Sequence, residues 1–424
     1  MLSSVIILVL SLMPGMMQGE AAPAPAAAPE PAPAAAAPAP EPAAPAPAPA
    51  PAPGPAPDTA KSPEEFQKRV TAYGGAVDFV FTEPETLVKA LKGASNKGRG
   101  VVRWLSSSGP LGCFTSSLTE TKGANLLCAF SAGSQEASGD KAIWLARYSE
   151  RDGWERYEQV AKISDMPHWS PVLFRDPKNA IYLFFKVGAD VPSWQTYWIS
   201  SEDAGRSWSK AEELVPGDRG GRGPSRNKPV ILTEDTWLAP ASIERGDRNP
   251  GAWQAFADRS DDLGKTWVRS DNFPLDPAAV PGAGVLQPAF WESAPNEVHA
   301  LMRTSGGFVG RSDSHDGGKT WTPVVSSNLA NNNSPVDVLR LEDGRLLLVF
   351  NPARKDGGSQ TPLTLAMSTD NGATWANVAH LEGEAGTITS PCIIRTRGGL
   401  AVSYTWNSQR IRCWQIPLQV LDLP

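Results

Sequence analysis

Short segments in which apolar and polar residues alternate occur along much of the chain. Examples are Leu363–Met367, Trp198–Ser200 and Ala76–Thr82. A period of two residues is typical of β-strands that bury one face. The pattern therefore predicts an all-β protein, with one short helix over Ser62–Tyr73 before the main body.

One eight-residue motif recurs between such strands. It has the form Ser-x-Asp-x-Gly-x-Ser/Thr-Trp, and its copies are Ser201–Trp208, Ser260–Trp267, Ser314–Trp321 and Ser368–Trp375, with a degenerate copy at Ser149–Trp154. Successive copies begin 52, 59, 54 and 54 residues apart, which is close to the length of one propeller blade. In a hairpin turn the Asp can accept backbone N–H groups, the Gly can supply a positive φ and the Trp can pack on the blade. We therefore interpret these Asp residues as scaffold rather than catalytic groups.

This spacing predicts one six-bladed β-propeller over residues 61–424, with the last blade shared between the two ends of the chain. The segments Ala76–Thr82 and Ile411–Leu418 are the expected closing strands. Ring closure would remove the exposed sheet edges that an open array of strands leaves.

The N-terminal region differs in composition from the body. Residues 1–20 contain an apolar run followed by small residues, which predicts a signal peptide, with an uncleaved membrane anchor as the alternative. Residues 21–60 are mostly Ala and Pro, so they predict a disordered linker that acts either as a semi-stiff spacer or as a passive tail. The sequence therefore favours export.

Composition excludes some classes of function. The net charge is −6 and the chain has no basic stripe, so nucleic acid is a poor candidate partner. With four His and four Cys the chain also offers few metal ligands, and no metal site is expected. The cysteines flank two predicted hairpins, Cys113 with Cys128 and Cys392 with Cys413, which suggests either two local disulfides or buried free thiols.

The repeated motifs resemble the Asp boxes of sialidases (neuraminidases), and the similarity extends from about Val77 to Arg412. The chain is also similar to a bacterial branch of predicted neuraminidases in segments outside the turns. These segments are Pro167–Asp176, Gly223–Pro229, Leu238–Glu244, Gly284–Pro288, Leu329–Ser334 and Tyr404–Asn407. The resemblance implies an exo-acting glycoside hydrolase that releases terminal sialic acid through a Tyr nucleophile, an Arg clamp and an Asp acid/base. It implies a glycan substrate, no cofactor and a monomer.

Three residues are candidates for catalytic roles, Asp140 and Tyr404 by the resemblance and Glu244 by the Arg and Lys residues beside it. Asp140 stands where the acid/base Asp is expected, Glu244 is a general base or the partner of a nucleophile, and Tyr404 is the phenol nearest in sequence to the expected nucleophile. Charged and amide residues at strand ends are the candidate substrate-binding residues: Glu136, His168, Lys186, Arg226, Asn227, Lys228, Gln287, Arg303, Asp337 and Arg354.

Three positions depart from the family pattern. No clamp Arg lies in Gly112–Ser117, where Phe114 takes a position at which the resembling branch tends to have His. Gln360 stands where another clamp Arg is expected, and Ser390 stands where the nucleophile Tyr is expected. These differences leave two further functions open: a carbohydrate-binding or surface-display propeller without catalysis, and a glycosidase with a changed substrate.

Overall fold

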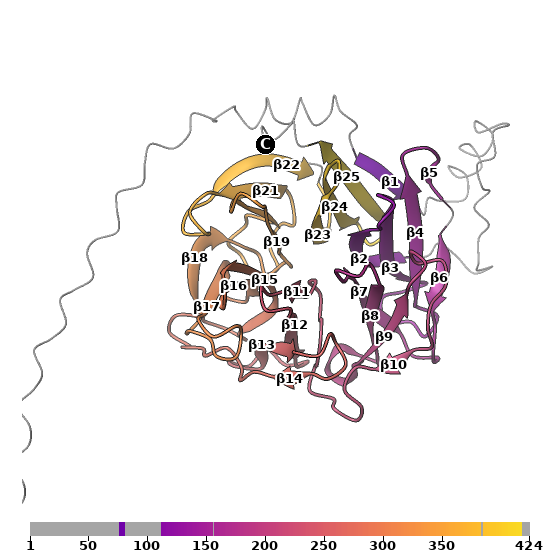
Figure 1. The fold of residues 1–424 in the computed structure, drawn as a ribbon. Helices are drawn as coiled ribbons and strands as arrows, with labels where there is room; N and C mark the ends of the chain where they lie inside the picture. The colour runs from indigo at the N-terminus through magenta and orange to yellow at the C-terminus, as the bar shows by residue number, and fades with distance from the viewer. Residues whose placement is uncertain (1–75, 81–111, 156, 383–384, 418–424) are drawn as a thin grey trace, which may run out of the picture. The chain divides into compact units, whose positions relative to one another are not determined.

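The computed structural model describes residues 76–80, 112–155, 157–382 and 385–417. Its β-strands form six sheets arranged in a ring, which confirms the six-bladed propeller (Figure 1). The signal peptide predicted over 1–20, the linker over 21–60 and the helix over Ser62–Tyr73 lie outside the described residues. Within the described ranges, no helix has the length and hydropathy needed to cross a membrane.

Each blade is a set of neighbouring antiparallel strands, and the first strand listed here for each blade is its inner strand. Blade 1 consists of β2 Gly112–Glu120, β3 Leu126–Gly133, β4 Ala142–Ser149, β5 Gly153–Trp154 and β6 Glu158–Ala161. Blade 2 consists of β7 His168–Arg175, β8 Ile181–Val187, β9 Gln195–Ser201 and β10 Glu212–Glu213. Blade 3 consists of β11 Val230–Ile231, β12 Trp237–Glu244, β13 Trp253–Ser260 and β14 Val268–Arg269.

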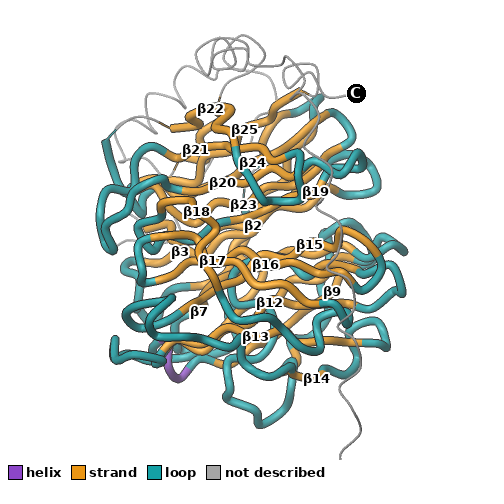
Figure 2. Tube along the Cα trace, turned by 90° about the vertical axis from the view of Figure 1, so that its left-hand side faces the viewer, coloured by secondary structure: helices purple, strands orange, loops and turns teal. Residues whose placement is uncertain are grey.

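Blades 4 to 6 follow in the same order. Blade 4 consists of β15 Val285–Ala294, β16 Glu297–Thr304, β17 Phe308–Ser314 and β18 Val325–Ala330. Blade 5 consists of β19 Asp337–Arg340, β20 Leu346–Phe350, β21 Leu363–Ser368 and β22 Ala376–Glu382. Blade 6 consists of β23 Ile388–Thr396, β24 Gly399–Trp406, β25 Arg410–Pro417 and β1 Ala76–Val80. Seen from the side, the strands of these blades lie across the molecule and the loops gather at their ends (Figure 2).

Ring closure occurs in the sixth blade. Strand β1 pairs with β25 in antiparallel register, Ala76 opposite Trp414. The two predicted closing segments therefore meet, so the last blade combines both ends of the folded body and its outer edge is the N-terminal strand.

The turns formed by the repeated eight-residue motif have the predicted geometry. In the copy that begins at Ser314, the Asp316 carboxylate accepts hydrogen bonds from the backbone N–H groups of Lys319 and Thr320 and from the Thr320 hydroxyl. Gly318 has a φ of 84°, and the Trp321 indole donates to the Gly318 carbonyl. These Asp residues are occupied in fixing their own turns and lie away from the site described below.

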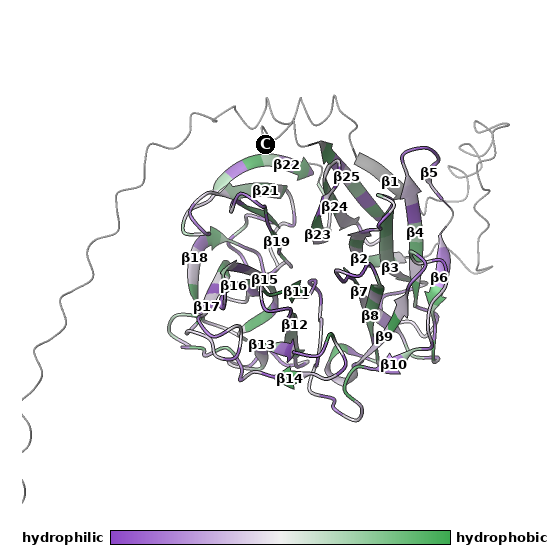
Figure 3. Ribbon diagram, viewed as in Figure 1, coloured by the Kyte–Doolittle hydropathy of each residue, from purple (hydrophilic) through white to green (hydrophobic). Residues whose placement is uncertain are grey.

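Apolar side chains fill the spaces between blades. Separate clusters join neighbouring sheets, and the strands carry most of the hydrophobic colour in Figure 3. The cluster between blades 1 and 6 contains all four cysteines, Cys113, Cys128, Cys392 and Cys413, as buried free thiols. The structure thus shows the second of the two alternatives considered for these residues.

Thiol labelling tests this arrangement. Burial raises the pKa of the Cys113, Cys128, Cys392 and Cys413 thiols, and only an accessible thiolate attacks a disulfide reagent. We expect the native protein to react negligibly with a chromogenic disulfide reagent, and four thiols per chain to react in guanidinium without reductant. A count of two or none in denaturant would show that disulfides form instead.

Candidate functional site

The candidate site lies at the mouth of the propeller, which we define as the face carrying loops 134–141, 188–194, 245–252, 305–307 and 351–362. These loops join the second and third strands of blades 1 to 5, beside the start of each inner strand; Val285 at the start of β15, for instance, pairs with Thr304 at the end of β16. The motif turns occupy the opposite ends of the strands. Loops from different blades therefore converge on one face, as in other propellers.

Two charged residues form the centre of this site. Glu244 ends β12 and is half-buried, and Arg303 lies one residue before the end of β16 in the next blade. Desolvation raises the pKa of the Glu244 carboxyl, while Arg303 and Arg248 act in the opposite direction and Glu136 of blade 1 raises it further. The Glu244 carboxyl is thus affected by the charges of Glu136 in blade 1 and Arg303 in blade 4, although the three residues come from three blades.

The Arg303 guanidinium is held by two amides. Its Nε donates to Asn333 Oδ1 at 2.9 Å, and its Nη1 donates to Gln287 Oε1 at 3.4 Å. Gln287 has a φ of 55° at a bulge in β15. No described residue accepts a hydrogen bond from Nη2, so the guanidinium is oriented on one side and keeps donor capacity for a ligand.

Arg248 supplies a second guanidinium that the sequence analysis missed. It forms an ion pair with Asp356 and lies over the Trp253 ring, 4.7 Å from its centroid. Asp356 also accepts a hydrogen bond from Asn333 Nδ2 at 3.1 Å. Arg248, Asp356 and Asn333 therefore connect to Arg303 in one network. Asn333 lies within the matched segment Leu329–Ser334 and Arg248 follows Leu238–Glu244, but the sequence gives no cue to Asp356.

Asp140 lies on the exposed loop between β3 and β4. Both of its carboxylate oxygens are 3.1 Å from the backbone nitrogen of Ser134, and Ser134 Oγ also donates to Oδ1. Partial desolvation favours the protonated form, but hydrogen bonds from Ser138 and Ser134 outweigh it and lower the pKa of Asp140. The side chain is therefore held as a carboxylate, which suits a base or a stabiliser of positive charge better than a proton donor.

Lys141, the next residue, anchors this loop from below. Its Nζ is buried, donates to the Glu136 carbonyl at 2.6 Å and lies 3.4 Å from the centroid of the Trp169 ring and 4.9 Å from that of Phe114. Burial lowers the pKa of Lys141 to about 7. The loop that carries Glu136 and Asp140 is thus fixed to aromatic rings of two inner strands.

Two predicted binding residues have their polar atoms occupied inside blade 2. His168 Nε2 accepts from the Ile163 N–H and Nδ1 donates to the Met166 carbonyl, while burial lowers its pKa to about 4. Lys186 Nζ donates to Thr196 Oγ1 and the Arg222 carbonyl, and burial lowers its pKa to about 7. Both side chains support the loops around the mouth.

The segment Arg226–Lys228 lies inside the ring and ties blades together. Arg226 donates to the Ser116 and Pro391 carbonyls, and Asn227 Nδ2 donates to the carbonyls of Gln287, Pro288 and Val336. Lys228 Nζ donates to Asp337 Oδ2 at 2.5 Å. Burial disfavours the Lys228 charge, but this ion pair outweighs it and raises its pKa.

Two further predicted site residues are Tyr404, inside blade 6, and Arg354, on the mouth loop 351–362. Tyr404 is fully buried, and its hydroxyl contacts Glu382 and the Trp414 indole; burial raises its pKa well above the ordinary value. Arg354 lines a separate cavity of about 270 Å³ with Gly306–Phe308 and Ser326. A buried neutral phenol is poorly placed to attack a bound sugar, so the chemistry proposed below does not use Tyr404.

Comparisons with known proteins place the chain in a family. A family model described as a BNR repeat-like domain matches residues 124–405. The chain belongs to this family. The sequence comparison with curated proteins found no significant match.

Solved structures with this fold include sialidases. The BNR-repeat chain superposes on the Hadza microbial sialidase Hz136 with a TM-score of 0.61 at 17% identity, covering 73% of this chain and 66% of that one. It matches a protein of unknown function from Dyadobacter fermentans with a TM-score of 0.59 at 18% identity, covering 75% and 97%. A K499G mutant of NanB sialidase from Streptococcus pneumoniae gives 0.57 at 10% identity, covering 76% and 71%. The chain therefore shares its fold with these sialidases.

Proposed function

We propose that this BNR-repeat protein is an exo-acting glycoside hydrolase of the sialidase type, which releases a terminal anionic sugar, sialic acid by default, from a glycan. The observation that carries the proposal is the network at the mouth that joins Arg303 to Arg248 through Asn333 and Asp356, beside the half-buried carboxyl of Glu244. Two guanidiniums can bind the carboxylate of such a sugar, and a half-buried carboxyl beside them can exchange a proton. The protein would act as an exported monomer.

The environments of the carboxyls suggest different roles from those implied by the family resemblance. Glu244 has an elevated pKa, so we assign it proton donation to the leaving glycosidic oxygen, whereas Asp140 stays ionised and would activate water or stabilise the positive charge that develops on the sugar. Arg303, held by Gln287 and Asn333, would bind the substrate carboxylate together with Arg248. Exposed Ile163 and Met166, on the loop beside Asp140, could contact an acyl group.

The pH dependence follows from the Glu244 assignment. Because burial raises the pKa of Glu244 above its usual value near 4.5, the proton-donating form persists into mildly acidic solution and is lost as the pH rises further. We expect kcat/KM for a fluorogenic sialoside to fall about tenfold for each pH unit above that pKa. A rate that instead rises steadily from pH 5 to 8 would exclude Glu244 as the proton donor.

A carbohydrate-binding propeller without catalysis is the second candidate function. It is favoured by the absence of a phenol among the described mouth residues and by Gln360 at an expected clamp position, whose backbone carbonyl accepts from Asn351. Glycan-array binding without release of sugar would support it. Release of sugar would support the hydrolase.

A further inference from the structure

A second group of reactive side chains lies on the motif face, at the opposite ends of the strands from the mouth. Ser293 is near the end of β15, His299 is on β16 and Asp313 is on β17. Ser293 Oγ is 2.7 Å from His299 Nε2, and His299 Nδ1 is 2.5 Å from Asp313 Oδ1. A hydroxyl, an imidazole and a carboxylate thus form one hydrogen-bonded series.

The carboxylate sets the imidazole tautomer. Desolvation favours protonated Asp313, but the hydrogen bond from His299 and the charge of Arg311 outweigh it and lower the pKa of Asp313. Ionised Asp313 can only accept, so Nδ1 carries the proton, and the Nε2 lone pair faces both the Ser293 hydroxyl and the Asn371 amide. The His299 ring is also stacked on Trp291, with centroids 5.0 Å apart. This is the arrangement in which a histidine can take a proton from a serine nucleophile.

Part of this network is scaffold, and comparison with blade 3 separates that part. Arg311 donates to the Asn371 carbonyl in the motif turn of the next blade, and Arg259 donates in the same way to Gly317. Around Arg259 the remaining partners are Asp261 and Thr236, with no imidazole. The need to fix the turn of the next blade therefore explains why Arg311 and Asp313 are present. It does not explain His299 and Ser293, because the equivalent contact of Arg259 is made without an imidazole.

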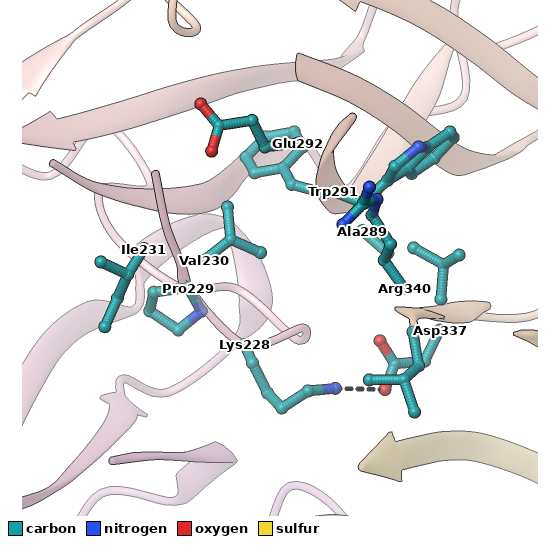
Figure 4. Close-up of a pocket in the computed structure, with 12 residues that line it drawn as sticks. Lys228, Pro229, Val230, Ile231, Ala289, Trp291, Glu292, Asp337 and Arg340 are labelled. Carbon is teal, nitrogen blue, oxygen red and sulfur yellow. Dashed lines mark hydrogen bonds and ion pairs between the residues drawn. The ribbon is translucent and has the colours of Figure 1, made fainter. Parts of the chain in front are cut away.

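The surroundings of Ser293 offer access and donors. Ser293 is half-buried, and its carbonyl accepts a hydrogen bond from Arg340 Nη2 at 3.4 Å. Asn371 Nδ2 donates to His299 Nε2 at 3.0 Å, and its Oδ1 accepts from the Trp291 indole at 2.8 Å. Arg340, Trp291 and Glu292 also line a cavity of about 350 Å³ with apolar walls of Val230, Ile231, Val338 and Leu339 (Figure 4). Ser293 is not among the residues that line this cavity, but it directly follows Glu292, which does, and the Arg340 side chain can stabilise negative charge on an acyl carbonyl oxygen.

We propose that Ser293, His299 and Asp313 form a second catalytic site that hydrolyses short-chain carboxylic esters. Ser293 Oγ attacks the ester carbonyl carbon while its proton moves to His299 Nε2. The bond between that carbon and the alcohol oxygen breaks, and the alcohol leaves with the proton from His299. Water then attacks the acyl-Ser293 ester, gives a proton to His299, and releases the carboxylic acid as the proton returns to Ser293.

The test uses the full chain with p-nitrophenyl acetate and a fluorophosphonate probe. We expect ester turnover above the rate in buffer, stoichiometric labelling of Ser293 located by peptide mass spectrometry, and loss of both in Ser293→Ala. His299→Gln should lower turnover about 100-fold or more. The matched control Ser326→Ala changes an exposed serine of the same blade and should keep full activity.

Three outcomes would overturn the proposal: no labelling of Ser293 in the folded wild type, labelling elsewhere only, or ester turnover that Ser293→Ala leaves unchanged. Thermal unfolding of each variant shows whether a loss reflects misfolding. If His299→Gln misfolds, probe labelling of wild-type Ser293 still decides the matter. Glu244→Gln should retain ester turnover, which separates this site from the mouth.

Discussion

Glu244→Gln is expected to lower kcat for sialoside hydrolysis about 1,000-fold while the protein keeps its fold. Glutamine preserves the size and polarity of the side chain but cannot donate the proton that the leaving oxygen needs, and positioned acids contribute roughly 100- to 10,000-fold to such rates. Because Arg303 and Arg248 are held by Asn333, Gln287 and Asp356 and not by Glu244, substrate binding should change far less than kcat. Steady-state kinetics with a fluorogenic sialoside measure both values.

Glu342→Gln is the matched control for this substitution. Glu342 is an exposed glutamate after β19, on the face opposite the mouth, so the exchange makes the same chemical change without touching the cluster. It should leave kcat and KM unchanged. Equal activity of Glu244→Gln and the wild type would remove Glu244 from the mechanism.

Arg303→Lys is expected to raise KM for an anionic glycoside about 30-fold, with a smaller effect on kcat. Lysine keeps one positive charge but loses the planar fork that Asn333 and Gln287 orient, and a bidentate contact to a carboxylate is lost with it. The measurement is KM for a sialoside.

Binding of an uncharged sugar analogue provides the control for Arg303→Lys. If Arg303→Lys weakens only the contact with the substrate carboxylate, the variant should bind the neutral analogue with the same affinity as the wild type. A parallel loss for charged and neutral ligands would mean that Arg303 serves to position the surrounding loops and does not contact the substrate carboxylate.

The ring could be predicted from the sequence because its cues are local. Each Asp in the repeated turns is bonded within its own eight residues, as Asp316 is to Thr320, so the motif specifies a hairpin and its spacing specifies a blade. The closing strands were predictable for the same reason: alternation is visible in each segment, and an unpaired edge strand needs a partner.

The site was predictable only in part because its residues come together from different blades. Glu244 and Arg303 were found through segments that resemble the family, but nothing in the sequence indicates that Arg248 pairs with Asp356 over a hundred residues away. Burial in the folded protein also determines whether a side chain can contact a substrate, and the residue type alone does not show this. His168 is neutral between two backbone groups, and the Tyr404 hydroxyl is enclosed between Glu382 and Trp414.

The cysteines illustrate the same limit. Spacing pairs Cys113 with Cys128 and Cys392 with Cys413, yet in the folded ring all four belong to one apolar cluster between the first and last blades. Contacts across that junction depend on closure of the propeller, and a pattern within one hairpin does not report them.

The most direct test of the proposed glycosidase site is release of sugar by the full-length protein from three fluorogenic substrates: an α-sialoside, a β-glucuronide and a neutral β-galactoside. The mouth presents two guanidiniums beside the Glu244 carboxyl, whose pKa is raised, so the account predicts turnover of an anionic substrate, the sialoside first, and none of the galactoside. A folded protein that releases none of the three sugars, or that cleaves the neutral substrate as fast as the charged ones, would contradict it.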